Sequence, residues 1–370
     1  MTVRVGVVGT SWWSDAMYLP ALREHPDAEV VAVCGRNPQR TRSFVDAWAI
    51  PQAFTDYAEM LDAGLDAVII ASSNATHYVY TAQALERGLH VLCEKPLTRT
   101  VAEAEELLKL AKAKGVKHMV PFTYRFMPTN RYLKRLIDDG YLGQPYHMDL
   151  RYYTGYARDG AYHWRFDLGE SGSGVLGDLG SHWLYLARWF YGEVTALTCR
   201  FGHHVPRGSR PDGKPYTQTE DSATLLLEFA NGAQANLFVS AACFENSPFG
   251  QTHQMSFHGS DGTLHSTVDW DKVQEVRGAR AGEGMPQPLT IPDDIWEGVR
   301  RDTVHNTYRD VFRQEDHMAR GFITAILEDK PASPDFGDGL AVQKLMAAAQ
   351  RSAASGCRVE LDQKLSAKLL

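Results

Sequence analysis

Residues 90–96 read His-Val-Leu-Cys-Glu-Lys-Pro. The apolar residues at the centre of this stretch predict a short buried strand, and Glu94 and Lys95 follow at its carboxyl end. In open α/β sheets this edge binds ligands, because loops and helix N-termini converge there. Pro96 fixes its own φ, which predicts a stiff corner at Lys95. An ordinary surface lysine at a strand end is the alternative that these residues alone leave open.

On both sides of this stretch, apolar runs alternate with helical segments. The first run reads Val-Arg-Val-Gly-Val-Val and ends in Gly9, which is typical of a buried parallel strand. Thr100 and Glu103 have the spacing of a capping box at the start of a helix. Strands are expected at 3–9, 29–34, 67–71, 90–93 and 117–121, and helices at 16–25, 38–48, 56–63, 77–87 and 101–114. This alternation predicts a doubly wound parallel sheet, the Rossmann arrangement.

The turn after the first strand is the phosphate site if the fold binds a dinucleotide. It reads Gly9-Thr10-Ser11-Trp12-Trp13-Ser14, so serines stand where G-x-G-x-x-G has its second and third glycines. A serine side chain hinders the approach of a pyrophosphate to the backbone without forbidding it. The two tryptophans are expected either to wall the nicotinamide pocket or to pack against a second domain.

The end of the second strand bears on the choice of cofactor. An Asp or Glu there would bind a ribose 2′-hydroxyl, but the chain has Cys34-Gly35-Arg36-Asn37, with Arg40 one turn later. The absent carboxylate and the arginines favour a 2′-phosphate, and therefore NADP over NAD. Arg36 stacked on adenine in either cofactor, or simply solvated, is the alternative.

From residue 146 the pattern changes to strands without intervening helices. Strands are expected at 146–156, 195–202, 221–229, 234–242, 254–258 and 262–267, and Asn231-Gly232 predicts a hairpin. We therefore expect an α+β domain over 123–370, with a large, mainly antiparallel open sheet, after a dinucleotide-binding domain over 1–122. An open apolar sheet face usually meets a partner chain, so a homodimer or homotetramer is expected.

A second group of polar residues lies in this half. Asp178 and His182 are four residues apart on an expected helix that follows the small residues 171–174, so both leave the same helix face. A carboxylate beside an imidazole orients the ring and stabilises the imidazolium, as proton transfer requires. A local hydrogen bond with no catalytic role is the alternative. The preceding His163-Trp164-Arg165 is a candidate substrate contact.

Composition narrows the functional class further. The net charge of −7 argues against a nucleic-acid partner, and no apolar run reaches the length of a membrane span. The absence of a signal-peptide pattern and five dispersed cysteines indicate a cytoplasmic protein with reduced thiols. No His/Cys set has zinc-ligand spacing, so no metal is expected. Residues 277–310 predict a long loop that serves as a lid or dimer contact, followed by helices at 306–328 and 339–355.

Several motifs, in this order, resemble the Gfo/Idh/MocA family of oxidoreductases. They are Gly6-Val7-Val8-Gly9, Asn74 with His77, Glu94-Lys95-Pro96, Tyr124-Arg125-Phe126, residues 139–143, residues 174–182, Glu220-Asp221 and residues 336–339. The resemblance implies that Lys95 lies beside nicotinamide and substrate, with a Lys-Pro peptide that is often cis, and that Asp178 and His182 act with it. It also implies cofactor contacts from Gly9, Thr10, Ser11, Trp12, Trp13, Arg36, Arg40, Ser72, Asn74, His77, Glu94, Lys95 and Arg125. Many members have a second Asp where this chain has Tyr185, which points to a different substrate contact.

These observations predict an oxidoreductase that uses NADP, or NAD, and acts on a sugar, polyol or related hydroxyl/carbonyl substrate in an interdomain cleft. His182 would accept the hydroxyl proton and Lys95 would stabilise the alkoxide. Two alternatives stay open. One is NAD-dependent glycosidase-type hydrolysis on the same fold, and the other is a dinucleotide-sensing regulator, which needs no Lys-Asp-His set.

Overall fold

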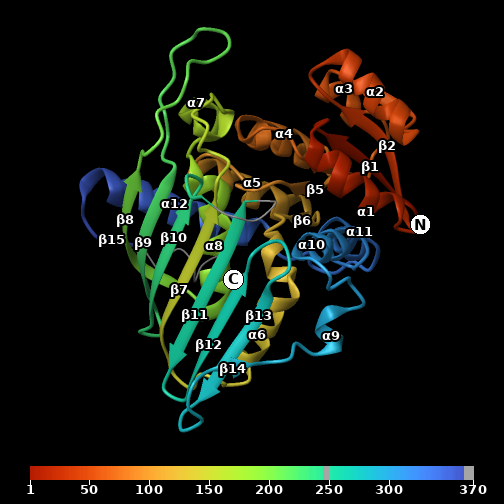
Figure 1. Ribbon diagram of the computed structural model, residues 1–370. Coiled ribbons are helices and arrows are strands. Elements are labelled where there is room, and N and C mark those ends of the chain that lie inside the picture. The colour runs from red at the N-terminus through yellow and green to blue at the C-terminus, as the bar shows by residue number, and fades with distance from the viewer. Residues whose placement is uncertain (245–249, 362–370) are drawn as a thin grey trace. The chain divides into compact units, whose positions relative to one another are not determined.

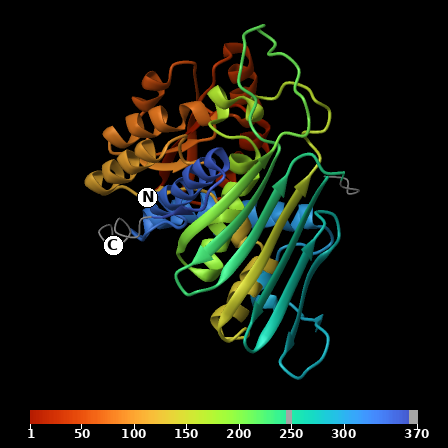
Figure 2. The same ribbon diagram turned by 90° about the vertical axis from the view of Figure 1, so that its left-hand side faces the viewer.

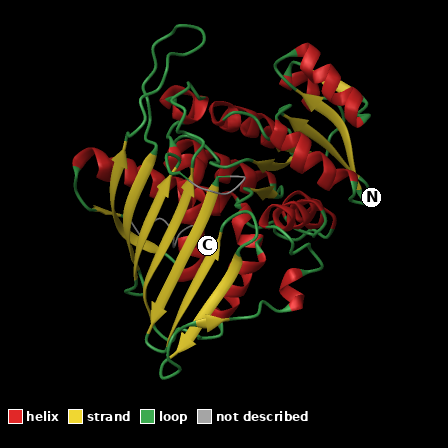
Figure 3. Ribbon diagram, viewed as in Figure 1, coloured by secondary structure: helices red, strands yellow, loops and turns green. Residues whose placement is uncertain are grey.

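The computed structural model describes residues 1–244 and 250–361, and the chain divides into two compact units (Figures 1 and 3). The first unit contains residues 1–123 and 308–343, and the second contains residues 124–307 and those from 344 onward. The expected domains, 1–122 and 123–370, therefore differ from the compact units in one respect. Residues 308–343 return to the first unit, which makes it discontinuous in sequence.

The first unit is built on a parallel sheet of six strands in the order β3-β2-β1-β4-β5-β6, which confirms the Rossmann prediction. The strands are β1 (Val3–Val8), β2 (Ala28–Cys34), β3 (Gln52–Phe54), β4 (Ala67–Ile70), β5 (His90–Cys93) and β6 (His118–Met119). β1, β4 and β5 carry apolar side chains that are fully buried, as expected for strands covered on both faces. The sequence did not predict β3, because its three residues form no apolar run.

Of the six helical segments between the strands of this unit, three begin at a side-chain cap (Asn37, Asp56 and Thr100) and three do not. They are η1 (Ser14–Tyr18, a π-helical turn), α1 (Leu19–Arg23), α2 (Pro38–Trp48), α3 (Tyr57–Leu61), α4 (Asn74–Glu86) and α5 (Val101–Lys114). At the start of α5, the Thr100 side chain accepts from the Glu103 backbone at 3.3 Å, and the Glu103 carboxylate accepts from the Thr100 backbone at 3.0 Å. The predicted capping box is therefore confirmed.

The returning segment completes the β6 edge of this sheet. The expected single helix over 306–328 is wrong: α10 (Val304–Arg313) and α11 (Met318–Leu327) are separated by a break at His317, which is extended, and Met318, whose φ is +47°. Beyond α11, the Pro334 carbonyl accepts from the Val120 backbone at 2.9 Å. Phe336, fully buried at the start of α12 (Phe336–Ser355), packs with its ring tilted against that of His118, with the ring centroids 4.8 Å apart.

The second unit contains a nine-stranded sheet in the order β14-β13-β12-β11-β7-β10-β9-β8-β15. Its strands are β7 (Pro145–Thr154), β8 (Val194–Gly202), β9 (Ser222–Phe229), β10 (Gln234–Ser240), β11 (Gln251–Gly259), β12 (Gly262–Val268), β13 (Gln274–Arg280), β14 (Gln287–Pro288) and β15 (Val359–Glu360). β7 and β10 pair in parallel and the other neighbouring pairs are antiparallel, so the mainly antiparallel prediction is confirmed. The predicted hairpin joins β9 to β10, with Gly232 at φ +87°.

The expected long loop over 277–310 is partly wrong. It contains the end of β13, all of β14, helix α9 (Asp293–Trp296) and the start of α10. β13 reads Gln-Glu-Val-Arg-Gly-Ala-Arg, in which valine is the only large apolar residue, so the sequence shows no apolar period. Gly278 is needed there, because a Cβ would lie 2.7 Å from the Tyr141 hydroxyl.

One face of the nine-stranded sheet is covered by helices, among them α6 (Pro128–Asp138) and α8 (Ser181–Tyr191), and the other face is open (Figure 2). The open face is less apolar than expected. Leu226, 54% exposed, and the half-buried Phe238 share it with polar residues such as the ion-paired Asp149 and Arg151.

Candidate active site

The loop after β1 packs closely against the backbone that follows β4. Gly9 has φ +110°, and a Cβ at this position would lie 2.4 Å from the Ala71 carbonyl oxygen, so only glycine fits. The strand order reverses between β1 and β4, and doubly wound sheets bind ligands at such a switch point. Of the two serines that replace motif glycines, Ser11 supports the turn with its side chain: its hydroxyl accepts from the Ser14 backbone at 3.4 Å.

Glu94 ties this loop to the strand β5. Its carboxylate accepts from the Trp13 indole at 2.6 Å, the Tyr18 hydroxyl at 2.5 Å and the Lys95 backbone at 3.1 Å. Burial raises the pKa of Glu94, while the Tyr18 hydrogen bond and the Lys95 charge act in the opposite direction. Trp13 is therefore a positioning residue for the corner at Lys95, and Trp12, 59% exposed, is the more accessible of the two tryptophans. Sequence reasoning missed Tyr18, because no motif marks it as a partner of Glu94.

Lys95 lies at a corner that a buried histidine also holds. The Lys95–Pro96 peptide bond is cis, as the resemblance implied. His77, 1% exposed, has Nδ1 2.8 Å from the Pro96 carbonyl oxygen and Nε2 3.3 Å from that of Ser72. Burial lowers the pKa of His77, so the neutral ring connects the start of α4 to the corner. The sequence associated His77 with the cofactor, and the structure shows its contacts to the protein backbone.

Five more of the residues predicted to bind cofactor, Thr10, Arg36, Arg40, Ser72 and Asn74, lie beyond the carboxyl ends of β1, β2 and β4, at the same edge of the sheet. Arg36 and Arg40 are exposed after β2, and the Asn37 side chain caps α2 by accepting from the Arg40 backbone at 2.9 Å. Thr10 contacts Gly35, where a Cβ would lie 2.8 Å from its methyl group. Two further residues begin the connection from β4 into α4: Ser72, whose hydroxyl is 2.7 Å from that of Thr76, and Asn74.

In the second unit, the predicted helix over 175–190 begins with a π-helical turn, η4 (Leu176–Gly180), before α8. The chain passes very close to residue 220, because a Cβ on Gly174 would lie 2.1 Å from the Glu220 carbonyl oxygen. The Leu176 backbone donates to the Glu220 carboxylate at 3.0 Å. Burial raises the pKa of Glu220 to about 7. Glu220 thus anchors the turn that carries Asp178.

Asp178 holds two side chains from the segment before it. Its carboxylate accepts from the Tyr156 hydroxyl at 2.7 Å and forms an ion pair with the Arg165 Nε at 3.1 Å. In a π-helical turn the backbone pairs i with i+5, so the spacing of Asp178 and His182 does not have the α-helical i, i+4 geometry on which the sequence argument relied. The catalytic role of this pair stays a prediction.

His182 is 7% exposed and lies among aromatic rings. The Tyr124 ring meets it edge to face, with centroids 4.7 Å apart. The Tyr124 and Tyr152 hydroxyls are 2.7 Å apart, and Tyr152 donates to the Gln251 side chain at 2.9 Å. This cluster fixes the place of His182, and the sequence did not reveal it because its members come from separate elements.

Two predicted residues of this unit bind each other. Arg125, expected to contact cofactor, donates to the hydroxyl of Tyr185, expected to contact substrate, at 2.7 Å. The Arg125 guanidinium also lies 5.4 Å from the Trp189 ring centroid. Tyr185 is 3% exposed, so the residue that replaces the family's second Asp is part of the packed interior.

The predicted substrate residues 163–165 form a compact turn, η3 (Trp164–Phe166). His163 Nδ1 accepts from the Arg165 backbone at 3.2 Å, and the Arg165 guanidinium lies 4.6 Å from the Trp164 ring centroid. Burial and the Arg165 charge lower the pKa of His163. Through Arg165, this turn is joined to Asp178.

Two absences concern the described residues alone. Within 1–244 and 250–361, no group of three or more His, Cys, Asp or Glu side chains is placed to hold a metal ion. The helices in the same ranges include none with the length and apolar character needed to cross a membrane.

The fold and these residues define a two-domain oxidoreductase with an NAD(P)-binding Rossmann domain. Residues 3–122 match the model of an oxidoreductase family with an NAD-binding Rossmann fold, and residues 130–265 match the GFO/IDH/MocA C-terminal domain. The chain is 30% identical over 300 residues to an uncharacterised oxidoreductase of Synechocystis sp., covering 78% of each chain. This chain belongs to the Gfo/Idh/MocA family.

Two further comparisons involve levoglucosan dehydrogenases. The chain is 26% identical over 375 residues to the levoglucosan dehydrogenase of Pseudarthrobacter phenanthrenivorans, covering 93% of this chain and 91% of that one. A solved levoglucosan dehydrogenase in complex with NADH and levoglucosan superposes with a TM-score of 0.86 at 24% identity, over 98% of this chain and 100% of that one. The structural likeness establishes the fold.

The raised pKa of Glu220 predicts a pH-dependent stability. The folded protein favours the protonated Glu220 carboxyl. The contribution of this residue to the free energy of unfolding is therefore fully present below its ordinary pKa of 4.5, and it is lost as the pH rises through about 7. We expect Glu220→Gln, which removes this loss, to be more stable than the parent at pH 8, by on the order of 3 kcal/mol at most. The difference should shrink toward pH 5.

Thermal unfolding followed by circular dichroism at pH 5 and pH 8 checks this. Glu228→Gln is the matched control, because its exposed carboxylate accepts from Arg358, whose hydrogen bond lowers the pKa of Glu228. The control should show no gain at pH 8. A Glu220→Gln variant with the parent's melting temperature at both pH values would contradict the expectation.

Proposed function

We propose that this protein transfers a hydride between NAD(P) and a CH–OH group of a sugar or polyol. The observation that carries the proposal is the fixed corner at Lys95, placed by Glu94 and His77 at the carboxyl edge of an NAD(P)-binding sheet. A charged side chain that extends from a backbone held by buried partners suits the stabilisation of charge that develops during reaction. The similarity to the levoglucosan dehydrogenase described above supports this substrate class.

The residues of the chain have separate proposed roles. When bound, the nicotinamide accepts or returns the hydride. His182 is the proposed base that takes the hydroxyl proton, and the aromatic cluster around it limits its motion. Lys95 is the proposed stabiliser of alkoxide charge. Asp178, held by Tyr156 and Arg165, is the proposed partner that holds the tautomer of the imidazole.

The residues at the sheet edge are compatible with a dinucleotide. Gly9 lets the backbone approach closely, and Arg36 and Arg40 leave their guanidinium groups exposed after β2. We propose NADP as the preferred cofactor, because guanidinium groups bind phosphate in a bidentate manner and no carboxylate ends β2. We also propose that the enzyme works in the cytoplasm, as its three buried cysteine thiols suit a reducing compartment.

The cofactor proposal predicts tighter binding of NADPH than of NADH. Arg36→Ala should weaken NADPH binding by roughly 10- to 100-fold, the effect of one lost charged hydrogen bond, and leave NADH binding nearly unchanged. Fluorescence titration of both cofactors measures this. Arg42→Ala is the control, because Arg42 is exposed on α2 and paired with Asp46 at 3.4 Å. Equal affinities in the parent, or equal losses for both cofactors, would refute the preference.

The catalytic proposal predicts that Lys95 serves turnover more than cofactor binding. Lys95→Ala should retain nearly native cofactor affinity and lose about 10²–10³ in rate, because the charge it stabilises exists only during reaction. His182→Ala should also lose activity, and the fall in oxidation rate at low pH should disappear, since a protonated imidazole cannot accept the proton. Asp178→Asn should be milder with the same pH signature.

Steady-state kinetics across pH, on a panel of sugars and polyols with both cofactors, tests these variants. Lys109→Ala, an exposed lysine on α5, and His204→Ala serve as controls. Normal turnover in both Lys95→Ala and His182→Ala would show that the assignment is wrong and favour the sensor alternative. Product without net cofactor reduction would favour the hydrolytic alternative.

The open sheet face predicts a homo-oligomer. We propose a homodimer or homotetramer that buries this face, because Leu226, 54% exposed, and the half-buried Phe238 lie on it. Light scattering at micromolar concentration should give at least twice the mass of one chain. Leu226→Asp should lower that mass, while Val79→Asp, at a position 46% exposed on α4, should not. A monomeric parent protein would contradict the proposal.

A further inference from the structure

The turn η1 carries a backbone carbonyl whose usual helical partner is a proline. In an α-helix, the carbonyl of Ala16 would accept a hydrogen bond from the N–H of residue 20. Residue 20 is Pro20, the second residue of α1, which has no N–H to donate. The backbone forms a π-helical turn here, in which the Leu19 N–H donates to the Ser14 carbonyl. The Ala16 carbonyl is therefore a place where a donor from another segment can bind.

Arg313, in the returning segment 308–343, supplies such a donor. Its Nε donates to the Ala16 carbonyl oxygen at 2.8 Å, and its Nη2 donates to the same oxygen. The two residues are 297 positions apart in the chain. A second arginine of this segment, Arg320 on α11, donates to the Ala21 carbonyl at 3.2 Å. Hydrogen bonds from a charged donor are roughly twice as strong as those between neutral groups, so the segment holds the backbone of η1 and α1 firmly.

Phe312, the residue before Arg313, packs against two aromatic side chains of the same region. Its fully buried ring meets the rings of Trp13 and Tyr18 edge to face, with centroids 5.7 and 5.4 Å apart. Tyr308, one turn earlier in α10, has its ring centroid 6.3 Å from that of Trp13. Edge-to-face pairs stabilise by more than the burial of their surface. The returning segment therefore contacts both the backbone of the turn and its aromatic side chains.

Trp13 and Tyr18 are also the side chains that bind Glu94. Both donate to one carboxylate oxygen, Oε1, and the Lys95 backbone N–H donates to the other, Oε2. A series of direct contacts thus leads from Phe312 and Arg313 through the turn and Glu94 to the backbone of Lys95. Close-packed interiors transmit small displacements, so a change at the start of this series should reach its end.

We propose that Phe312 and Arg313 are positioning residues for Lys95. They hold the turn η1, the turn holds the Glu94 carboxylate, and the carboxylate holds the backbone from which the Lys95 side chain extends. The inference deepens the proposed function and rests on it, because the position of Lys95 matters through the alkoxide charge that it is proposed to stabilise. The returning segment thereby becomes part of the candidate active site as well as the cover of the β6 edge.

Amide hydrogen exchange, followed by mass spectrometry of the full chain, tests the positioning without any substrate. The bond to Glu94 protects the Lys95 N–H in the parent protein. Arg313→Gln and Phe312→Leu should each speed exchange at Lys95, in the peptide that covers residues 90–97. The expected change is roughly 10-fold, the size of one lost charged hydrogen bond. Arg313→Lys keeps a charged donor without the fork and should recover part of the protection.

Steady-state kinetics shows whether the position matters for turnover. The probes are levoglucosan, D-glucose and scyllo-inositol with NADP, and the comparison uses the sugar or polyol that the parent oxidises. Both variants should lose roughly 10- to 100-fold in kcat, because a displacement of about 1 Å far from the chemistry can cost that much. The affinity for the cofactor should change little, since Gly9 is held by the strands: its N–H donates to the Cys34 carbonyl at 2.9 Å.

A double-mutant cycle with Glu94→Gln shows whether the effect passes through Glu94. Glutamine has an amide nitrogen in place of one carboxylate oxygen. Whichever way the amide lies, either the two donors from the turn or the Lys95 N–H loses its acceptor, and the link is broken. Arg313→Gln should therefore lower kcat much less in the Glu94→Gln protein than in the parent. Losses in kcat that simply multiply would overturn the inference.

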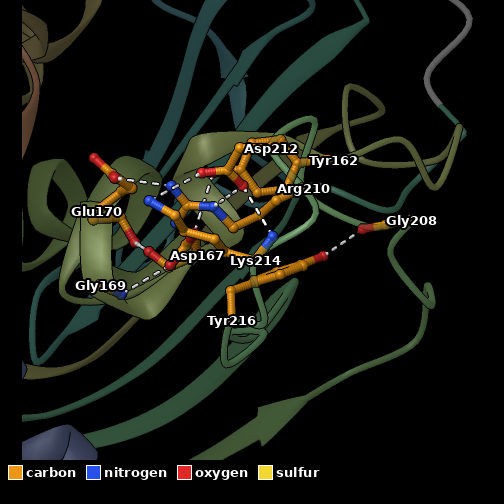
Figure 4. Close-up of polar contacts among 10 residues, drawn as sticks. Tyr162, Asp167, Gly169, Glu170, Gly208, Arg210, Asp212, Lys214 and Tyr216 are labelled. Atoms are coloured by element: carbon orange, nitrogen blue, oxygen red, sulfur yellow. Dashed lines mark hydrogen bonds and ion pairs between the residues drawn. The ribbon is translucent and has the colours of Figure 1, made fainter.

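Arg210 provides a matched arginine control in the second unit (Figure 4). Its guanidinium donates to the buried carboxylate of Asp167 at 2.6 Å and pairs with Asp212 at 3.2 Å. Arg210→Gln should lower the melting temperature, as Arg313→Gln should, and leave exchange over residues 90–97 at the parent rate. If Arg313→Gln and Phe312→Leu also lower only the melting temperature, both residues merely pack the fold and the inference is overturned.

The inference and the proposed function fail in different ways. Loss of turnover in Lys95→Ala, with parental exchange and kcat in Arg313→Gln and Phe312→Leu, would overturn the inference and leave the proposed function intact. Normal turnover in Lys95→Ala, with faster exchange at Lys95 in the same two variants, would refute the catalytic role of Lys95 and support the positioning. If the parent oxidises none of the probes, the exchange rates decide the positioning by themselves.

Discussion

The buried carboxylate of Glu94 is the interaction on which the first half of the site depends. It receives an indole N–H, a phenol and a backbone N–H, so the loop after β1, the turn η1 and the corner at Lys95 are fixed to one group. A buried carboxylate is costly unless such donors surround it. The same arrangement that stabilises Glu94 also fixes the backbone at Lys95, the residue proposed to stabilise alkoxide charge.

The sequence predicted most of the first unit because its local signals are strong. β5 and α5 have the expected bounds, since an apolar run and a capping box mark them. β3 and β13 were missed, as short or polar strands are defined by their partners rather than by their own residues. The break between α10 and α11 was also missed. Met318 adopts a positive φ there although it is not a glycine, so the sequence carries no signal for the break.

The candidate site also combines residues that the sequence could predict with contacts that it could not. Lys95, Asp178 and His182 could be named from short motifs, yet the partners that hold them come from distant segments. Tyr156 lies 22 residues before Asp178 in sequence. Arg207, whose guanidinium lies over the Phe166 ring, belongs to a loop with no motif. Sequence spacing indicates which groups share an element, whereas tertiary packing decides which groups meet across elements. The pairing of Arg125 with Tyr185 is a further contact of this kind.

The discontinuous first unit has a consequence for biosynthesis. A ribosome delivers residues 1–123 long before residues 308–343, which cover the β6 edge through Pro334 and Phe336. Until then the nascent sheet has an unpaired edge and an uncovered apolar surface, the two features that promote association between incomplete chains. The first unit to emerge therefore stays incomplete until residues 308–343 follow, and slower synthesis would lengthen the interval in which incomplete chains can associate.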